Sequence, residues 1–234
     1  LKILALIPAR GGSKGIPRKN VKLLGDQPLI NYTIASALAC DGLSTVVVST
    51  DDAEIAQVSQ AAGAAVPFMR PAALAADKSP TLDTVIHAIN YYQDQGQEFD
   101  AVCLLQPTCP FRTSAEISRA IDNFKAAGGD SLISVQEVPH HYNPHWVYEP
   151  QEGNGLLKIA TGEAEIISRR QDLPKAYHRD GSIYLTKTEV LLEQRSLYGQ
   201  SIAYVVLNSA HHVNIDTPDD WTEAERLLES FRKG

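Results

Sequence analysis

The sequence predicts an α/β protein with a mainly parallel sheet and helices on both of its faces. Short apolar runs rich in β-branched residues alternate with segments of helical periodicity from the first residue onward. This alternation is typical of sheets whose parallel strands are joined by helical crossovers. A length of 234 residues with 44% hydrophobic content suffices for one substantial core and a small inserted lobe.

The expected strands are four buried runs in the first part of the chain and two more near the C-terminus. In order they are Lys2–Pro8, Thr45–Ser49, Ala101–Leu105, Ser131–Val135, Ser182–Thr186 and Ile202–Leu207. Helical spacing predicts helices at Pro28–Cys40, Asp52–Gly63, Thr81–Gln95 and Thr113–Ala127. Because ligands of such sheets bind beyond the carboxyl ends of the strands, we expect the site to follow Ile7, Ser49 and Leu105.

The last helix has the clearest boundary signals in the sequence. Thr217 is expected to cap it, with Pro218 at its first position and Asp220 three residues after the cap. An apolar stripe at helical spacing follows, formed by Trp221, Ala224, Leu227, Leu228 and Phe231. This helix therefore packs one face against the core.

The alternation of strands and helices breaks near Pro139. Residues 140–178 are rich in Pro, His, Gly and Arg and show no clean period. We therefore expect one domain, residues 1–234, with an inserted lobe at about 139–180. Because the lobe lacks the periodicity of an independent core, a partner surface is expected to cover Trp146, Tyr148 and Leu157.

The charge balance argues against polyanionic partners. Twenty-one Lys and Arg residues against 28 Asp and Glu give a net charge of −7, so no affinity for nucleic acid or an anionic membrane is expected. No apolar run approaches the ~20 residues that span a bilayer. Cys40, Cys103 and Cys109 are too few and too scattered for a disulfide framework. We expect a cytoplasmic protein with reduced thiols.

A glycine-rich loop, residues 9–20, follows the first strand and carries three glycines and four cations. Glycines let backbone N–H groups approach an anion closely, and cations neutralise phosphates. The spacing matches neither the P-loop nor the GxGxxG dinucleotide motif. The loop is either a phosphate cradle or a solvated basic turn, and its position after the first strand favours the cradle.

The stretch Ile7–Asn20 resembles the signature of the acylneuraminate cytidylyltransferases, which make CMP-sialic acid and its bacterial relatives. Other segments resemble family segments in the same order: Val48–Asp51, Arg70–Pro71, Leu105–Arg112, Arg169–Pro174 and Ile215–Pro218. The resemblance covers nearly the whole chain. It implies a nucleotide-diphosphosugar-transferase-like, Rossmann-like fold, a requirement for CTP and Mg²⁺, with Mn²⁺ as a substitute, and a homodimer.

The reaction implied by the resemblance is attack by the anomeric hydroxyl of an acidic nine-carbon sugar on the α-phosphorus of CTP, which expels pyrophosphate. Such chemistry depends on in-line positioning and charge neutralisation. The resemblance makes Lys19 the main stabiliser of the α-phosphate and Arg10 a stabiliser of triphosphate and pyrophosphate charge. The other nucleotide-binding residues that it implies are Gly11, Gly12, Ser13, Lys14, Asn20, Arg70 and Thr81.

Several of these residues keep an alternative interpretation. Lys14 is either a phosphate ligand or a solvated loop cation, and Arg18 is expected at the surface. Arg70 could serve a loop turn before Pro71, and Thr81 could be a helix N-cap.

Two residues are candidates for sugar binding. Gln106 directly follows an apolar strand, where its amide can hydrogen-bond a sugar. Arg170 lies in the inserted lobe, and a bidentate guanidinium suits a sugar carboxylate. The resemblance suggests that the lobe crosses to the other subunit. The alternative for both lobe arginines is a surface salt bridge, which we favour for Arg169.

Asp216 is the metal candidate. Thr217 caps the last helix and Asp219 and Asp220 complement its dipole, so Asp216 is left without a structural role. Mg²⁺ commonly takes one or two carboxylates together with phosphate oxygens and water. The family often has a second Asp where this chain has Asn214, whose amide oxygen can coordinate without charge.

The remaining candidates are weaker. Cys109 stands where the family usually has Ser, and Cys103 is expected in the core. A zinc site at His140, His141 and His145 is disfavoured, because no Cys or acidic fourth ligand follows at zinc-like spacing.

We therefore expect CMP transfer to a sialic, legionaminic or related nonulosonic acid. One rival is the enzyme that activates the eight-carbon acid KDO, which resembles the chain less in the glycine-rich loop and at 169–174. Another is a non-catalytic sugar-nucleotide-binding protein, against which the presence of Arg10, Lys19 and Asp216 argues.

Overall fold

The computed structural model describes residues 1–207 and 209–232. The chain divides into two compact units. The first comprises Leu1–Ser134 and Gly181–Gly234, and the second comprises Val135–Asp180. Among the described residues, no helix has the length and apolarity that crossing a bilayer requires.

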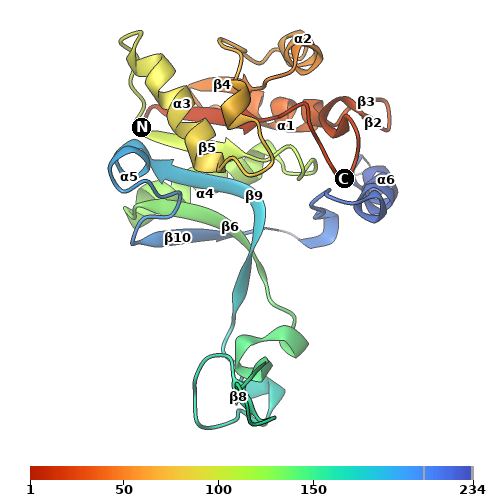
Figure 1. Cartoon of the computed structure of the whole chain (residues 1–234), viewed down its shortest axis with the longest axis vertical. Coiled ribbons are helices and arrows are strands. Elements are labelled where there is room, and N and C mark those ends of the chain that lie inside the picture. Colours follow the sequence, from red (N-terminus) through yellow and green to blue (C-terminus); the bar gives the residue numbers. More distant parts are fainter. Residues whose placement is uncertain (208, 233–234) are drawn as a thin grey trace. The chain divides into compact units, whose positions relative to one another are not determined.

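The first unit is built on a six-stranded sheet in the order β10-β6-β9-β5-β1-β4 (Figure 1). Its strands are β1 (Ile3–Pro8), β4 (Thr45–Ser49), β5 (Ala101–Leu105), β6 (Ser131–Glu137), β9 (Tyr177–Lys187) and β10 (Ile202–Val206). β1 runs parallel to β4 and β5, and β9 runs antiparallel to β5. The predicted mainly parallel sheet is confirmed, with β9 as an antiparallel strand that the pattern did not reveal.

Helices cover both faces of this sheet, as predicted (Figure 1). The core on one face includes residues of α1 (Leu29–Leu38), α2 (Ala53–Ala61) and α4 (Ser114–Ala127). The core on the other face includes residues of α3 (Thr81–Gln93) and α5 (Thr188–Glu193). β1 is buried from both sides, because Ile3, Ala5 and Ile7 join the first core while Leu4 and Leu6 join the second.

The last helix, α6 (Pro218–Phe231), begins as the sequence predicts. Thr217 accepts a hydrogen bond from the backbone N–H of Asp220, whose side chain bonds back to the cap backbone. Four members of the predicted stripe are buried and Phe231 packs against them; the buried four are Trp221, Ala224, Leu227 and Leu228. α6 therefore has a fixed start directly after Asp216.

Short elements complete the first unit. They are η1 (Lys19–Val21), β2 (Leu23–Leu24), β3 (Gln27–Pro28), η2 (Ala72–Leu74) and η6 (Ser209–His211). Cys40, Cys103 and Cys109 are buried in this part of the structure, and none of them is in a disulfide.

The second unit is made of short elements around a small antiparallel hairpin. They are η3 (His140–Tyr142), η4 (Pro144–Trp146), β7 (Tyr148–Pro150), β8 (Leu157–Ile159) and η5 (Arg170–Asp172), with β7 paired to β8. The Trp146 indole donates to the Ile167 carbonyl over 2.6 Å and is half-buried within its own unit. Tyr148 and Leu157 are exposed in the single chain. The expected partner surface thus stays a prediction for these two residues.

Candidate active site

A cavity of about 380 Å³ opens beyond the carboxyl ends of β1 and β5. Four separate segments line it: the glycine-rich loop, the region from Arg70 to Thr84, the residues after β5 and the residue before the cap of α6. The cavity brings together nine predicted site residues, namely Arg10, Ser13, Lys14, Lys19, Asn20, Arg70, Thr81, Gln106 and Asp216.

The three glycines of the loop have different roles. A Cβ on Gly15 would lie 2.1 Å from the carbonyl oxygen of Asp216, so only glycine permits this close approach. A Cβ on Gly11 would meet Asp52 Oδ2 at 2.8 Å, and the Gly11 N–H donates to Asp51 Oδ1 over 2.9 Å. Gly12 has open space around its Cβ position. Gly11 and Gly12 do not line the cavity, whereas Gly15 lines it together with Asp216.

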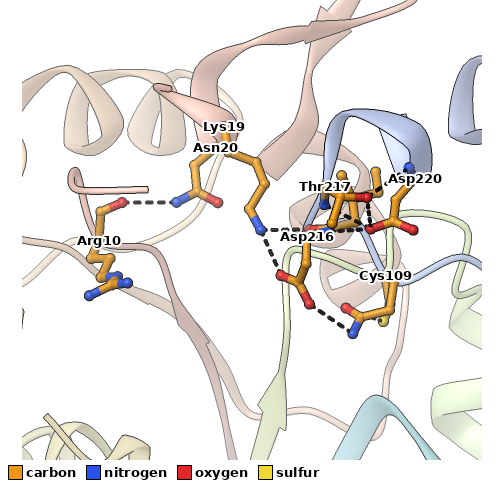
Figure 2. A network of polar contacts seen from close by, with 9 residues as sticks. Arg10, Lys19, Asn20, Cys109, Asp216, Thr217 and Asp220 are labelled. Atoms are coloured by element: carbon orange, nitrogen blue, oxygen red, sulfur yellow. Dashed lines mark hydrogen bonds and ion pairs between the residues drawn. The ribbon is translucent and has the colours of Figure 1, made fainter. Parts of the chain in front are cut away.

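Lys19 is held at the wall of the cavity by two oxygens. Its Nζ donates to the Ile215 carbonyl over 2.5 Å and to Asp216 Oδ1 over 3.0 Å (Figure 2). The Lys19 side chain is 12% exposed and that of Asp216 is 63% exposed, so the ammonium is fixed while the carboxylate faces solvent. Asn20 is buried and donates to the Arg10 carbonyl over 3.0 Å, which ties together the two ends of the loop.

Asp216 has neighbours that orient it. Its backbone N–H donates to Asp220 Oδ2 over 3.0 Å, and Asn214 Nδ2 donates to Asp216 Oδ2 over 3.2 Å. On its other side, Asn214 Oδ1 accepts from the Cys109 thiol over 3.8 Å. In this arrangement the amide donates toward Asp216 while its oxygen faces Cys109.

The donor set around Asp216 fits a metal ion that is held mainly by phosphates. Asp216 presents one exposed carboxylate, and no group of three His, Cys, Asp or Glu suited to a metal occurs among the described residues. Mg²⁺ suits such a site, because it keeps several waters and needs few protein carboxylates when phosphate oxygens are present.

Arg10 and Lys14 meet a carboxylate that the sequence analysis missed. Asp77 Oδ1 lies 2.9 Å from Arg10 Nη1, and Asp77 Oδ2 lies 2.5 Å from Lys14 Nζ. Lys14 first, and then Arg10, hold the pKa of Asp77 below its ordinary value. Lys14 lines the cavity and is ion-paired there, but its side chain is 77% exposed, so the phosphate ligand and the solvated loop cation both stay open as interpretations.

Arg70 is a buried cation of the cavity wall. Its Nε donates to Ser49 Oγ over 3.1 Å and its Nη2 donates to the Ser49 carbonyl. Burial lowers the pKa of Arg70 to about 10, so the group is still charged at neutral pH. Thr81 is the first residue of α3 and Pro80 is its N-cap, so the interpretation of Thr81 as a cap is wrong.

Gln106 and Arg18 complete the first unit's predicted set. Gln106 lines the cavity, and its carbonyl accepts from Arg112 Nη1 over 3.4 Å. Arg18 pairs with Asp52 and Glu54 at the surface, as expected. Arg18 also lowers the pKa of Asp52 to about 2.

The second unit has its own cavity of about 380 Å³, which Arg170 lines together with His140, Asn143 and Lys175. Arg169 pairs with Asp172 over 2.7 Å, in agreement with the surface salt bridge favoured for it. His145 Nδ1 lies 2.6 Å from Glu163 Oε2, an acidic neighbour that the sequence spacing did not reveal.

Comparisons with known proteins show the family of the chain. A family model described as cytidylyltransferase matches residues 4–233. The chain is 38% identical to a CMP-N,N'-diacetyllegionaminic acid synthase of Legionella pneumophila, over 98% of this chain and 97% of the relative. It is 36% identical to an N-acylneuraminate cytidylyltransferase A of Danio rerio, over 98% of this chain and 51% of that longer relative.

A solved structure shares the fold. It is a CMP:2-keto-3-deoxy-manno-octonic acid synthetase complexed with CTP, with a TM-score of 0.74 over 98% of this chain and 99% of that chain. The sequence identity is 17%, so this likeness concerns the fold alone.

Proposed function

The chain belongs to the cytidylyltransferase family, and from that premise we propose that it transfers CMP from CTP to a nonulosonic acid of the sialic or legionaminic type. Pyrophosphate is the other product. The observation that carries the proposal is the cavity in which Arg10, Lys14 and Lys19 converge beside the exposed carboxylate of Asp216. The identities of 38% and 36% to relatives named for such acids support the choice of acceptor.

In this proposal different cations of the cavity neutralise different phosphates of the nucleotide. Arg10 and Lys14, which already bind one anionic side chain, take the terminal phosphates. Lys19 is fixed by the Ile215 carbonyl and Asp216, so it needs no rearrangement to stabilise the charge that develops around the α-phosphorus. Gly15 lets the loop reach Asp216. Gln106 orients the sugar acceptor from the end of β5.

A Mg²⁺ ion, or Mn²⁺ in its place, would be held by Asp216 and phosphate oxygens and would supply further charge neutralisation. Asn214 could add its amide oxygen after a rotation of the amide that exchanges its two ends.

We further propose a cytoplasmic homodimer. The exposed side chains of Tyr148 and Leu157 in the second unit support the dimer, because an apolar surface of this kind favours burial against a partner. Arg170 then supplies a guanidinium for the carboxylate of the sugar.

The test is a panel of acceptors. The purified chain is incubated with CTP, Mg²⁺ and one acid at a time: N-acetylneuraminate, N,N'-diacetyllegionaminate, pseudaminate or KDO. We expect pyrophosphate release with one or more of the nine-carbon acids and none in EDTA. Equal turnover with UTP or ATP would contradict the nucleotide assignment, and preference for KDO would contradict the acceptor assignment. Release with no acid at all would contradict transfer.

A further inference from the structure

Asp77 lies in a short loop whose backbone is fixed by its own hydrogen bonds. Ser79 Oγ donates to the Ala73 carbonyl over 2.8 Å, and the Ser79 N–H donates to the Ala76 carbonyl over 3.0 Å. The Asp77 carboxylate instead contacts Arg10 and Lys14, which are far away in the sequence. Its ion pairs therefore act on the glycine-rich loop rather than on its own segment.

The two carboxylate oxygens each serve one cation. Oδ1 is 2.9 Å from Arg10 Nη1 and Oδ2 is 2.5 Å from Lys14 Nζ. Two oxygens of one phosphate group can bridge an arginine and a lysine in the same way. Both cations lower the pKa of Asp77, so the side chain is an anion at neutral pH. A phosphate group that uses these cations must compete with it.

We propose that Asp77 is a positioning residue whose carboxylate exchanges with the polyphosphate on Arg10 and Lys14. Asp77 holds the two cations at the cavity until the nucleotide arrives, and the polyphosphate then takes its place. After CMP transfer, the carboxylate competes with pyrophosphate for the same cations and so favours its release. The identity of this polyphosphate rests on the proposed function, whereas the competition for Arg10 and Lys14 does not.

The exchange and a purely structural role predict opposite results. If Asp77 competes with phosphate, removal of its charge strengthens binding of a free polyphosphate. If Asp77 merely holds the cations in place, its removal leaves them disordered and weakens that binding. Because Asp77 is 44% exposed and Lys14 is 77% exposed, solvent screening keeps the expected effect to about tenfold.

The experiment measures the affinity of inorganic pyrophosphate for the intact chain by isothermal titration calorimetry. The variants are Asp77→Asn, which removes the charge and keeps the shape, and Asp77→Glu, which restores the charge. Asp83→Asn is the matched control, since Asp83 also lies in the first unit and pairs with Arg195 over 2.7 Å, and neither residue is among those that line the cavity. All titrations use one ionic strength.

We expect Asp77→Asn to bind pyrophosphate about tenfold more tightly than the wild type, with Asp77→Glu and Asp83→Asn close to the wild type. An unchanged or weaker affinity in Asp77→Asn overturns the exchange, and so does the absence of binding in every variant. The titration measures binding of pyrophosphate alone and does not require the enzyme to turn over. If the acceptor panel gives no product while Asp77→Asn binds more tightly, the proposed function fails and the exchange stands.

Discussion

The ammonium of Lys19 lies 3.0 Å from Asp216 Oδ1, although 197 positions separate the two residues in the sequence. The same ammonium also donates to the carbonyl of Ile215, the residue before Asp216, over 2.5 Å, so its position is restricted by two oxygens. The pair joins the glycine-rich loop to the start of α6. The predicted catalytic cation and the predicted metal ligand therefore form one unit whose members should respond together to substitution.

Replacement of Lys19 by Ala should lower kcat by roughly 10²–10³, equivalent to about 2–4 kcal/mol of lost charge stabilisation. Lys22→Ala is the matched control. Lys22 carries the same charge three residues later, but its Nζ lies 4.0 Å above the Trp221 ring instead of lining the cavity. The kcat of both variants is measured by steady-state kinetics with CTP and the most active acceptor of the panel. A loss below tenfold in Lys19→Ala would reduce Lys19 to a structural cation.

Gly15→Ala should disrupt the site while Gly12→Ala leaves it intact. The new methyl group at position 15 would lie 2.1 Å from the Asp216 carbonyl, so the loop and Asp216 must separate. A displacement of about 1 Å at a reacting centre costs about 10²-fold in kcat/KM. The methyl group at position 12 meets nothing within 4 Å. Similar activities of the two variants would show that the approach of Gly15 to Asp216 is dispensable.

Asn214→Asp should reduce the Mg²⁺ concentration needed for half-maximal activity by about tenfold, because a second carboxylate strengthens an oxygen-ligand site. Asn214 Nδ2 lies 3.2 Å from Asp216 Oδ2, so the new charge also repels Asp216 until a cation binds. Asn123→Asp on α4 introduces the same charge away from the cavity lining and should leave the Mg²⁺ dependence unchanged. Equal Mg²⁺ dependence of both variants would argue against metal binding at Asp216.

The pH dependence of stability should reveal the Asp52–Arg18 pair. Arg18 lowers the pKa of Asp52 from 3.8 to about 2, and Asp52 also caps α2 through the Ile55 N–H. A depressed carboxyl pKa stabilises the fold above the unfolded pKa, and this contribution is lost as pH falls toward 2. After allowance for solvent screening, Asp52→Ala should cost about 1–2 kcal/mol at pH 7.

Urea unfolding of wild type and Asp52→Ala at several pH values between 7 and 2 tests this expectation. The difference in free energy of unfolding should shrink between about pH 4 and pH 2. Asp122→Ala, at an exposed position of α4, serves as the control. A difference that stays constant with pH would contradict a lowered pKa of Asp52 in the folded chain.

Arg170→Ala should raise the KM for the sugar by about 10–100-fold, since the substrate carboxylate loses its charged partner, and leave CTP binding unchanged. Arg169→Ala is the control, because Arg169 is already paired with Asp172. If the lobe completes the partner's site in a homodimer, a mixture of Arg170→Ala and Lys19→Ala subunits should regain activity. A mixture that stays inactive while its subunits exchange would place the action of Arg170 within its own chain.

Local signals in the sequence predicted the elements whose ends depend on neighbouring residues. Thr217 and Asp220 define the start of α6 through side-chain bonds only three residues apart. The position of the cavity was predictable in part, because parallel strands end at the same edge of a sheet: it follows Ile7 and Leu105 as expected, but the residues directly after Ser49 are not in its lining. Asp77 was not, because its contacts with Arg10 and Lys14 span 67 and 63 positions and no local pattern marks them.

Other features also depend on long-range structure. The antiparallel direction of β9 follows from the path of the chain after residue 139, where the sequence lacks a period. The short β7–β8 hairpin is too brief to produce an alternating pattern. The alternatives for Thr81 could be separated only when Pro80 proved to be the residue before the first turn of α3.

The inserted segment leaves the sheet from β6 and returns through β9, and these two strands are hydrogen-bonded neighbours. Because the inserted segment begins and ends at adjacent strands, it does not alter the pairing of the other strands in the sheet. Its length and composition can change while the strands that carry the glycine-rich loop keep their register. The topology thus allows residues 139–180 to change in sequence and length without a change in the strands around the cavity.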